Sequence, residues 1–309
     1  MVGRIGACMA GKLVTMAEAV ASVSNGSHIA LGGFAITRCV IAFVHEMIRQ
    51  NKRDLTVSQC IAGMETDLLV GAGCVKHIIY AGGSMDKFGL HESINRAIHR
   101  KAITIEEYSS LAICFKYLAG ALGLPFLPIK SIVGSDMQPD LTRDPGQKLA
   151  AEATCPFTGE KLFYVRALNP DVGIIHVNTS DEDGNAVVHG PKWDNAEMAK
   201  ASQRIILVAE EVVPKSYMMK MAGSVLVPGF RVEKVVHAPF GAYPSAVYRA
   251  YDYDAEHLKY YAEQHKDENK FKEYLDRYVF GVKDFWEYLE KWGGGRRLQE
   301  LKADTHLGY

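Results

Sequence analysis

In the first half of the chain, segments with apolar residues at helical spacing alternate with short apolar runs that are typical of strands. Thr15 and Glu18 have the spacing of a capping box, and apolar residues then recur at helical intervals up to Asn25-Gly26. A short apolar run follows at 28–31, then a helical pattern over 40–50 and a second apolar run at 55–58. This β-α-β order is typical of a parallel sheet.

The same alternation continues along the chain. We expect further strands at 75–80, 103–106, 172–177, 204–209 and 232–238, and helices at 93–100, 110–122 and 193–202. Strands that are apolar on both faces indicate a sheet with helices on both sides. The predicted fold class is therefore α/β, with an open, mostly parallel sheet.

Two segments depart from this pattern. Residues 134–160 contain several prolines and glycines with little periodicity, which predicts a long loop or crossover and a possible domain boundary. From 254 to 301 the chain is rich in glutamate, lysine and aromatic residues at loosely helical spacing, which predicts a helical tail. We expect an α/β domain over 1–253 and a C-terminal helical extension of the same domain over 254–309.

Composition excludes several classes of function. The 309 residues include 35 basic and 36 acidic side chains, and a net charge of −1 does not favour binding to nucleic acid or to a membrane surface. The N-terminal residues lack the apolar core of a signal peptide, and no run approaches the ~18 apolar residues of a membrane span. We therefore expect a cytoplasmic protein.

The cysteines and the common nucleotide and metal motifs give no positive signal. The six cysteines are scattered, without a Cys-x-x-Cys pair or a Cys/His cluster at zinc spacing, so no metal site is expected. Gly71-Ala72-Gly73 begins like a dinucleotide fingerprint, but Lys76 stands where its third glycine should fall. His45 starts a zinc-protease pattern, but Arg49 replaces the second histidine.

Three further features have simple structural interpretations. Residues 181–185, between two apolar runs, predict a hairpin turn, because they lack the spaced ligands and closing glutamate of a calcium loop. His176, His189 and His237 lie near predicted strand ends, and we interpret them as structural histidines. The chain has neither a Gly-x-Ser-x-Gly elbow nor a phosphate loop of the Gly-x-x-x-x-Gly-Lys type.

The candidate site begins at the turn Gly32-Gly33-Phe34, directly after the first predicted strand. Paired glycines let backbone N–H groups approach a ligand closely, which suits an oxyanion or a phosphate, although such a turn is often only a tight connection. The turn becomes informative together with other segments in a characteristic order. These are residues 28–34, 73–76, 106–109, 122–128, 159–161, 171–176, 210–211, 238–245 and 251–254.

Over nearly the whole chain, these segments resemble the family I CoA-transferases, specifically the A (α) subunit of the glutaconate CoA-transferase type. The resemblance implies the open-sheet fold shared by NagB, RpiA and the CoA-transferases. It also implies transfer of CoA from an acyl-CoA to a carboxylic acid, with a CoA thioester as substrate and no permanently bound cofactor. In this family a glutamate attacks the thioester and becomes a glutamyl-CoA thioester.

The family's nucleophilic glutamate stands in a short Glu-Asn-Gly or Glu-Ser/Gly-Gly motif, which this chain lacks. In the glutaconate type that residue belongs to the B subunit, so the resemblance implies no catalytic nucleophile here and a hetero-oligomer with B, α2β2 or larger. The A chain would supply oxyanion or substrate contacts from Gly32, Gly33, Phe34, Arg38 and Ser84. The sequence departs from the family pattern at Ala30 and at Cys39-Val40.

Two alternatives stay open. The first is one subunit of a CoA-thioester hydrolase of the ring-opening type on the same scaffold, whose members differ around 106–110 and the glycine turn. The second is a non-catalytic ligand-binding protein, for which residues 1–14 leave no room for a fused DNA-binding helix-turn-helix. The choice of acid and acyl-CoA depends on pocket shape, which the motifs do not reveal.

Overall fold

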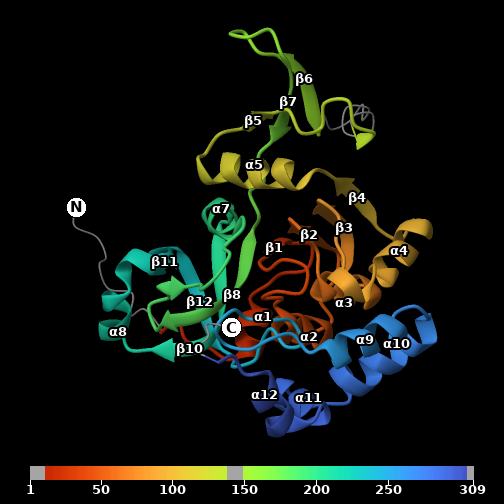
Figure 1. Cartoon of the computed structure of the whole chain (residues 1–309), viewed down its shortest axis with the longest axis vertical. Coiled ribbons are helices and arrows are strands. Elements are labelled where there is room, and N and C mark those ends of the chain that lie inside the picture. Colours follow the sequence, from red (N-terminus) through yellow and green to blue (C-terminus); the bar gives the residue numbers. More distant parts are fainter. Residues whose placement is uncertain (1–10, 138–148, 305–309) are drawn as a thin grey trace, which may run out of the picture.

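The structure is a computed structural model that describes residues 11–137 and 149–304. A parallel sheet runs through its centre in the order β12-β10-β8-β1-β2-β3-β4 (Figure 1). Its strands are β1 (His28–Leu31), β2 (Leu55–Gln59), β3 (Val75–Tyr80), β4 (Thr104–Glu107), β8 (Val172–Asp181), β10 (Arg204–Val213) and β12 (Val232–His237). The α/β class predicted from the alternating periods is confirmed.

Helices cover both faces of this sheet. Ile29, Leu31 and Ile174 face one hydrophobic cluster, while their neighbours Ala30 and Ile175 face the other, as the two-residue period of a strand requires. The first face is covered by α1 (Met16–Ala21), α2 (Ile41–Arg49), α3 (Met64–Gly71) and α4 (Glu92–His99). The second is covered by α5 (Ser110–Ala121) and α7 (Asn195–Ala201).

Several strand and helix ends follow from local signals. The Thr15 hydroxyl caps α1 and the Glu18 carboxylate accepts from the Thr15 N–H, so the predicted capping box is confirmed. β8 and β10 extend beyond their predicted ends because β8 also pairs with the short strand β9 (Ala186–Val187). The turn between β8 and β9 is closed by a hydrogen bond from the Asn185 N–H to the Asp181 carboxylate, 2.8 Å, which confirms the predicted hairpin.

An antiparallel arm projects from α5 away from the sheet (Figure 1). Its order is β5-β7-β6, with β5 (Phe126–Ile129), β6 (Ala150–Thr154) and β7 (Lys161–Arg166). The prediction of a long loop over 134–160 is therefore wrong for the residues of β6. Their weakly apolar sequence gives no strand signal, and pairing with β7 supplies the hydrogen bonds. The rest of that prediction falls partly on 138–148, outside the described residues.

The remaining elements are short segments near the sheet and the helices that come after its last strand. Near the sheet edge lie α8 (Lys215–Lys220), η2 (Ala222–Ser224), β11 (Val225–Val227) and η3 (Gly229–Arg231); η1 (Asp86–Phe88) follows β3. The C-terminal helices are α9 (Ala255–Gln264), α10 (Glu268–Leu275), η4 (Asp276–Phe280), α11 (Phe285–Lys291) and α12 (Gly294–Leu301). None of the helices within 11–137 and 149–304 combines the length and apolarity needed to cross a membrane.

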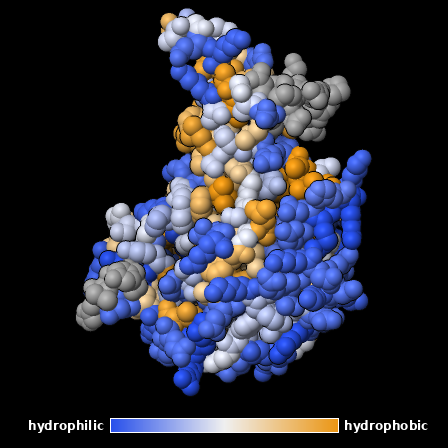
Figure 2. Space-filling view, turned by 45° about the vertical axis from the view of Figure 1, so that its right-hand side comes forward, coloured by the Kyte–Doolittle hydropathy of each residue, from blue (hydrophilic) through white to orange (hydrophobic). Residues whose placement is uncertain are grey.

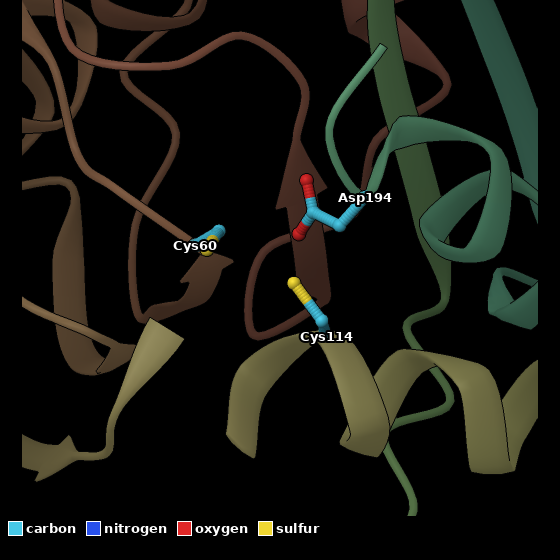
Figure 3. A group of neighbouring side chains, drawn as sticks. All are labelled: Cys60, Cys114 and Asp194. Carbon is cyan, nitrogen blue, oxygen red and sulfur yellow. The ribbon is translucent and has the colours of Figure 1, made fainter. Parts of the chain in front are cut away.

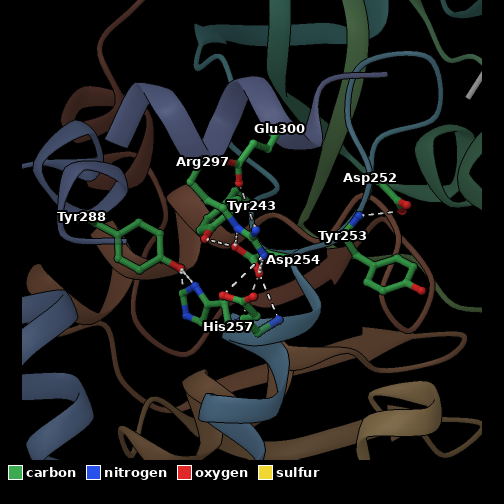
Figure 4. Close-up of polar contacts among 9 residues, drawn as sticks. Tyr243, Asp252, Tyr253, Asp254, His257, Tyr288, Arg297 and Glu300 are labelled. Atoms are coloured by element: carbon green, nitrogen blue, oxygen red, sulfur yellow. Dashed lines mark hydrogen bonds and ion pairs between the residues drawn. The ribbon is translucent and has the colours of Figure 1, made fainter. Parts of the chain in front are cut away.

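The C-terminal helices are fixed to the body by a buried carboxylate (Figure 4). Asp254 caps α9 and accepts hydrogen bonds from Arg297 of α12, at 2.7 and 2.9 Å, and from the Tyr243 hydroxyl, at 2.6 Å. Burial would raise the pKa of Asp254, but these donors outweigh it and hold the pKa at about 2. The predicted helices after residue 254 are present, and they pack into the hydrophobic cluster that also contains α2 and α3. That they form one domain with residues 1–253 stays a prediction.

Candidate functional site

Three loops lie side by side where β1, β2 and β3 end. The Ala35 N–H donates to the Ile61 carbonyl at 3.3 Å, which joins the first loop to the second. The Ala62 N–H donates to the Gly82 carbonyl at 3.1 Å, which joins the second to the third. The structure therefore brings the predicted glycine turn and the loop of Ser84 to one edge of the sheet, the carboxyl edge where open α/β sheets bind ligands.

The glycine turn needs Gly33 for a steric reason. Gly33 has φ of +99°, a region that favours glycine, and a Cβ there would lie 2.7 Å from the Arg38 carbonyl oxygen and 2.9 Å from that of Thr37. Close packing continues in the next loop, where a Cβ on Gly63 would lie 2.2 Å from the Ala35 carbonyl oxygen. The three loops form one closely packed surface because these positions lack side chains.

The N–H groups of the turn are all engaged within the chain. Gly32 donates to the Ile174 carbonyl at 2.9 Å and Phe34 to the Thr37 carbonyl at 2.9 Å. Gly33 donates to Oδ1 of Asn195 at 3.4 Å, the longest of the three bonds. The expectation of open oxyanion donors does not fit this arrangement, since each of these N–H groups already has an acceptor. Only the long Gly33 bond ends on a side chain instead of a backbone carbonyl.

Trp193, just before α7, covers the turn. Its ring stacks on Phe34 with centroids 4.8 Å apart and planes at 11°. From the sequence, Trp193 was expected to lie in a helix and was given no role. The only signal available was an aromatic residue at the start of a predicted helix.

Arg38 lies behind the turn. Its guanidinium is fully buried, donates to the Pro191 carbonyl at 2.7 Å and to Asn195 at 3.4 Å, and lies 4.9 Å from the Trp193 ring. Burial lowers the pKa of Arg38 to about 10. Its two terminal nitrogens face these groups, and its buried Nε has no hydrogen-bond partner among the described residues. The full burial of Arg38 does not fit the expected contact with a substrate.

Ser84 is half-buried in the third loop. Its Oγ accepts a hydrogen bond from the Asp86 N–H at 3.1 Å, which leaves the hydroxyl proton available to another acceptor. The neighbouring Met85 is buried and holds the loop to the core. Of the five predicted site residues, Gly32, Gly33, Phe34 and Ser84 thus belong to one surface.

Two adjoining cavities open beside the turn. The smaller, about 270 Å³, is lined by Thr37 and Trp193, and the larger, about 630 Å³, contains Glu210 and Lys302. They share Arg249, Tyr251 and Ala303. A cleft with aromatic walls and a few convergent charges is the usual form of a small-molecule site.

A hydrogen-bonded network forms the wall of the larger cavity. Glu210 accepts from Tyr251 at 2.5 Å and contacts Nε2 of His176 at 2.6 Å, while its second oxygen accepts the Phe240 N–H at 2.6 Å. His176 is fully buried, and its Nδ1 has no hydrogen-bond partner among the described residues, so its interpretation as a structural histidine stays a prediction. His189 instead lines the cavity.

Three side chains that the sequence did not connect meet next to the turn. Cys60 follows β2, Cys114 lies on α5, and Asp194 stands between Trp193 and Asn195; their ligand atoms all lie within 4.8 Å of one another. Burial raises the pKa of Asp194 to about 6. Their separation along the chain explains why no spacing motif revealed them.

Comparison with known proteins identifies the family. Residues 13–238 match the family model described as Coenzyme A transferase. The chain is 34% identical to the A subunit of glutaconate CoA-transferase of Acidaminococcus fermentans, over 96% of this chain and 97% of that one. It is 33% identical to the A subunit of 3-oxoadipate CoA-transferase of Pseudomonas knackmussii, over 92% and 99%.

Other matches include a longer protein and a subunit of a hydrolase. An uncharacterized protein of Archaeoglobus fulgidus is 34% identical, and the match covers 97% of this chain and 66% of that protein. The cholesterol ring-cleaving hydrolase IpdA subunit of Rhodococcus jostii is 29% identical over 91% of this chain.

Solved structures agree with the sequence relationships. The crystal structure of glutaconate coenzyme A-transferase from Acidaminococcus fermentans superposes with a TM-score of 0.91, covering 96% of this chain and 98% of that chain. The decarboxylase AibA/AibB superposes with a TM-score of 0.74 at 28% identity. The predicted resemblance to CoA-transferase A subunits is confirmed, and the chain belongs to the coenzyme A transferase family.

Proposed function

We propose that this chain is the A half of a two-subunit enzyme that moves CoA between an acyl-CoA and a carboxylic acid. The observation that carries the proposal is the meeting of the glycine turn and the Ser84 loop at one sheet edge, in a chain without the family's glutamate motif. A cavity lined by Thr37 and Trp193 lies beside the turn. The relatives named as A subunits of glutaconate and 3-oxoadipate CoA-transferases support the proposal.

In the proposed reaction the B subunit supplies the nucleophilic carboxylate. That glutamate attacks the thioester carbonyl and releases CoA thiolate, which leaves a mixed anhydride; the thiolate then attacks the glutamyl carbonyl, giving a glutamyl-CoA thioester and the free acid. The acceptor acid takes up CoA by the same steps in reverse order. Each tetrahedral state places negative charge on a former carbonyl oxygen, which needs positioned donors.

The A chain supplies such donors from its carboxyl edge. The Ser84 hydroxyl donates to the oxyanion or to the substrate carboxylate, because its Oγ already accepts from Asp86 and is thereby oriented. The Gly33 N–H becomes a second donor when Asn195 releases it, since that bond is 3.4 Å long. Arg38 acts indirectly, by holding the Pro191 carbonyl and Asn195 behind the turn.

An apolar strip on the surface is the proposed contact with the B subunit. Figure 2 shows hydrophobic residues gathered in a band that runs from the projecting arm down onto the body. Large exposed apolar side chains on and near α5 and the arm are Leu111, Leu122, Leu124, Phe126 and Phe157. We infer that the B subunit covers this strip, because a patch of this kind marks a protein interface. The full assembly is proposed as α2β2 or larger.

The proposed setting is the cytoplasm, with no permanently bound cofactor. The five described cysteines are free thiols, which fits a reducing compartment. The second candidate activity is hydrolysis of a CoA thioester, supported by the 29% identity to the ring-cleaving hydrolase subunit. The higher identity to the two transferase subunits favours transfer.

Two measurements on the purified A/B complex test the proposal: one locates the covalent intermediate, and the other distinguishes transfer from hydrolysis. The complex is treated with acyl-CoA, reduced with borohydride or digested directly, and analysed by mass spectrometry. A CoA-dependent modification confined to the B subunit supports the proposal, whereas one on the A chain refutes it. Formation of the enzyme thioester itself releases one equivalent of free acid per B subunit, so only continued release over many turnovers without any carboxylate acceptor would replace transferase by hydrolase.

A further inference from the structure

The group of Cys60, Cys114 and Asp194 has no part in the proposed CoA transfer. Figure 3 shows the Cys114 sulfur pointing from α5 toward the Asp194 carboxylate, with Cys60 on the neighbouring loop. The two sulfurs and the carboxylate oxygen all lie within 4.8 Å of one another. Side chains of types that bind metal ions thus come together from three separate parts of the fold.

The carboxylate of this group lacks an ion-pair partner. Asp194 is only 4% exposed, and its side-chain hydrogen bond comes from Asn195 at 3.2 Å. None of the ion pairs found within 11–137 and 149–304 includes Asp194. The charge of Arg38 lies near it, but the Arg38 guanidinium donates to Asn195 and to Pro191. Burying a carboxylate without a partner is costly, and a bound cation offsets that cost.

We propose that Cys60, Cys114 and Asp194 form a binding site for a divalent cation of the zinc class. Two thiolates and a carboxylate are zinc ligands, whereas magnesium and calcium prefer oxygen alone. Zinc–ligand lengths of about 2.0–2.3 Å place tetrahedral ligand atoms about 3.5–3.8 Å apart. A group whose ligand atoms lie within 4.8 Å of one another therefore contracts around the ion. The displaced thiol protons pass to solvent.

A metal ion could reach this site from the surface and would keep one coordination position free. Cys114 is half-buried, so an ion can reach the group from the α5 side, while Cys60 and Asp194 are buried behind it. Three protein ligands leave the fourth tetrahedral position for water.

The bound ion acts as a clamp on the glycine turn. Asp194 is flanked by Trp193, which stacks on Phe34, and by Asn195, which accepts from Gly33. Cys60 precedes Ile61, whose carbonyl accepts from the turn. An ion that joins Cys60 to Asp194 would therefore connect the two segments that contact the turn.

The test measures metal binding without substrate, so its result is independent of the proposed activity. The untagged, reduced chain in complex with B is freed of metal with a chelator and titrated with Co²⁺, followed by sulfur-to-cobalt charge-transfer absorption and by competition with Zn²⁺. We expect one equivalent per A chain and a raised midpoint of thermal unfolding. Cys114→Ser and Asp194→Asn should each weaken binding at least about tenfold, the range seen when metal-site groups are lost.

The control is Cys155→Ser, which removes a half-buried thiol on the arm and should leave the titration unchanged. The proposal is overturned if no stoichiometric binding occurs, or if binding persists unchanged in both site variants. It is also overturned if peptide mapping of the protein, isolated under reducing conditions, finds Cys60 and Cys114 joined as a disulfide.

Discussion

The Trp193 ring lies nearly parallel to the Phe34 ring, at 11° and 4.8 Å between centroids, and covers the glycine turn from the side of α7. The same residue contacts the Arg38 guanidinium at 4.9 Å. Phe34 and Arg38 both follow Gly33, and hydrogen bonds between Phe34 and Thr37 close the segment between them. Trp193 therefore contacts both the half-buried Phe34 ring and the buried guanidinium behind it.

Replacing Trp193 tests whether this contact maintains the active form of the turn. Trp193→Ala should lower kcat/KM of the A/B complex about tenfold, the equivalent of a lost aromatic contact of about 1.4 kcal/mol. Steady-state kinetics measure the effect. Trp286→Ala on α11, an exposed tryptophan, is the control and should keep full activity. Equal activity of the two variants would contradict the role of the stack.

Gly33 and Gly73 provide a matched pair for the turn. Both have positive φ, +99° and +72°, but a Cβ at Gly33 meets two carbonyl oxygens whereas one at Gly73 has nothing within 4 Å. Gly73→Ala should cost about 1 kcal/mol of unfolding free energy from strain alone. Gly33→Ala should cost clearly more and abolish transfer, as urea unfolding and activity assays will measure. Similar losses in both would show that the close approach is unimportant.

Ser84 should affect the chemical step. Ser84→Ala is expected to lower kcat of the complex on the order of a hundredfold, since a lost oxyanion donor costs about that much, with KM less affected. Ser84→Thr, which keeps the hydroxyl, should recover part of the rate. Ser22→Ala at the end of α1 removes a hydroxyl that bonds only the Ala19 carbonyl and should be neutral. A Ser84→Ala enzyme with unchanged kcat would exclude the serine from the site.

The apolar strip predicts where the B subunit binds. Phe126 is 44% exposed on the arm and Met219 is 70% exposed on α8, at the far side of the body in Figure 1. Phe126→Lys should weaken A/B association at least about tenfold, because a charge would be buried in the interface. Met219→Lys should not, as isothermal titration or analytical ultracentrifugation will show. The opposite ranking would place the partner on another face.

The buried side chain of His257 predicts that the free energy of unfolding decreases in acid. Burial lowers the pKa of His257, stacked on Trp292, to about 3, whereas an unfolded histidine titrates near 6.5. The unfolded state therefore binds the extra proton between these values, and stability falls as the pH drops through that window.

From about pH 7.5 to about pH 5 this single group should remove about 2 kcal/mol of unfolding free energy. His257→Gln should reduce the pH dependence of urea unfolding by that amount, whatever its effect on stability at neutral pH. His99→Gln, on an exposed position of α4, is the control. An unchanged pH dependence in His257→Gln would show that this histidine is protonated in the folded chain.

The sequence by itself determined the order of the elements. Capping at Thr15, the two hydrophobic periods and the Asp-Gly-Asn turn are local signals, because each depends on hydrogen bonds or burial within a few residues. The family motifs likewise placed the glycine turn and Ser84, and the missing glutamate motif pointed to a second polypeptide. Those features could be predicted because they do not depend on the rest of the fold.

Only the tertiary structure determined which hydrogen-bonding groups already have partners within the chain and which remain free. β6 is a strand because it pairs with β7. The Gly33 N–H is engaged because Asn195 lies next to it, and Arg38 is buried against the segment that contains Pro191. Cys60, Cys114 and Asp194 meet only because β2, α5 and α7 pack together. Burial and hydrogen-bond pairing between distant segments are set by packing, which local periodicity does not encode.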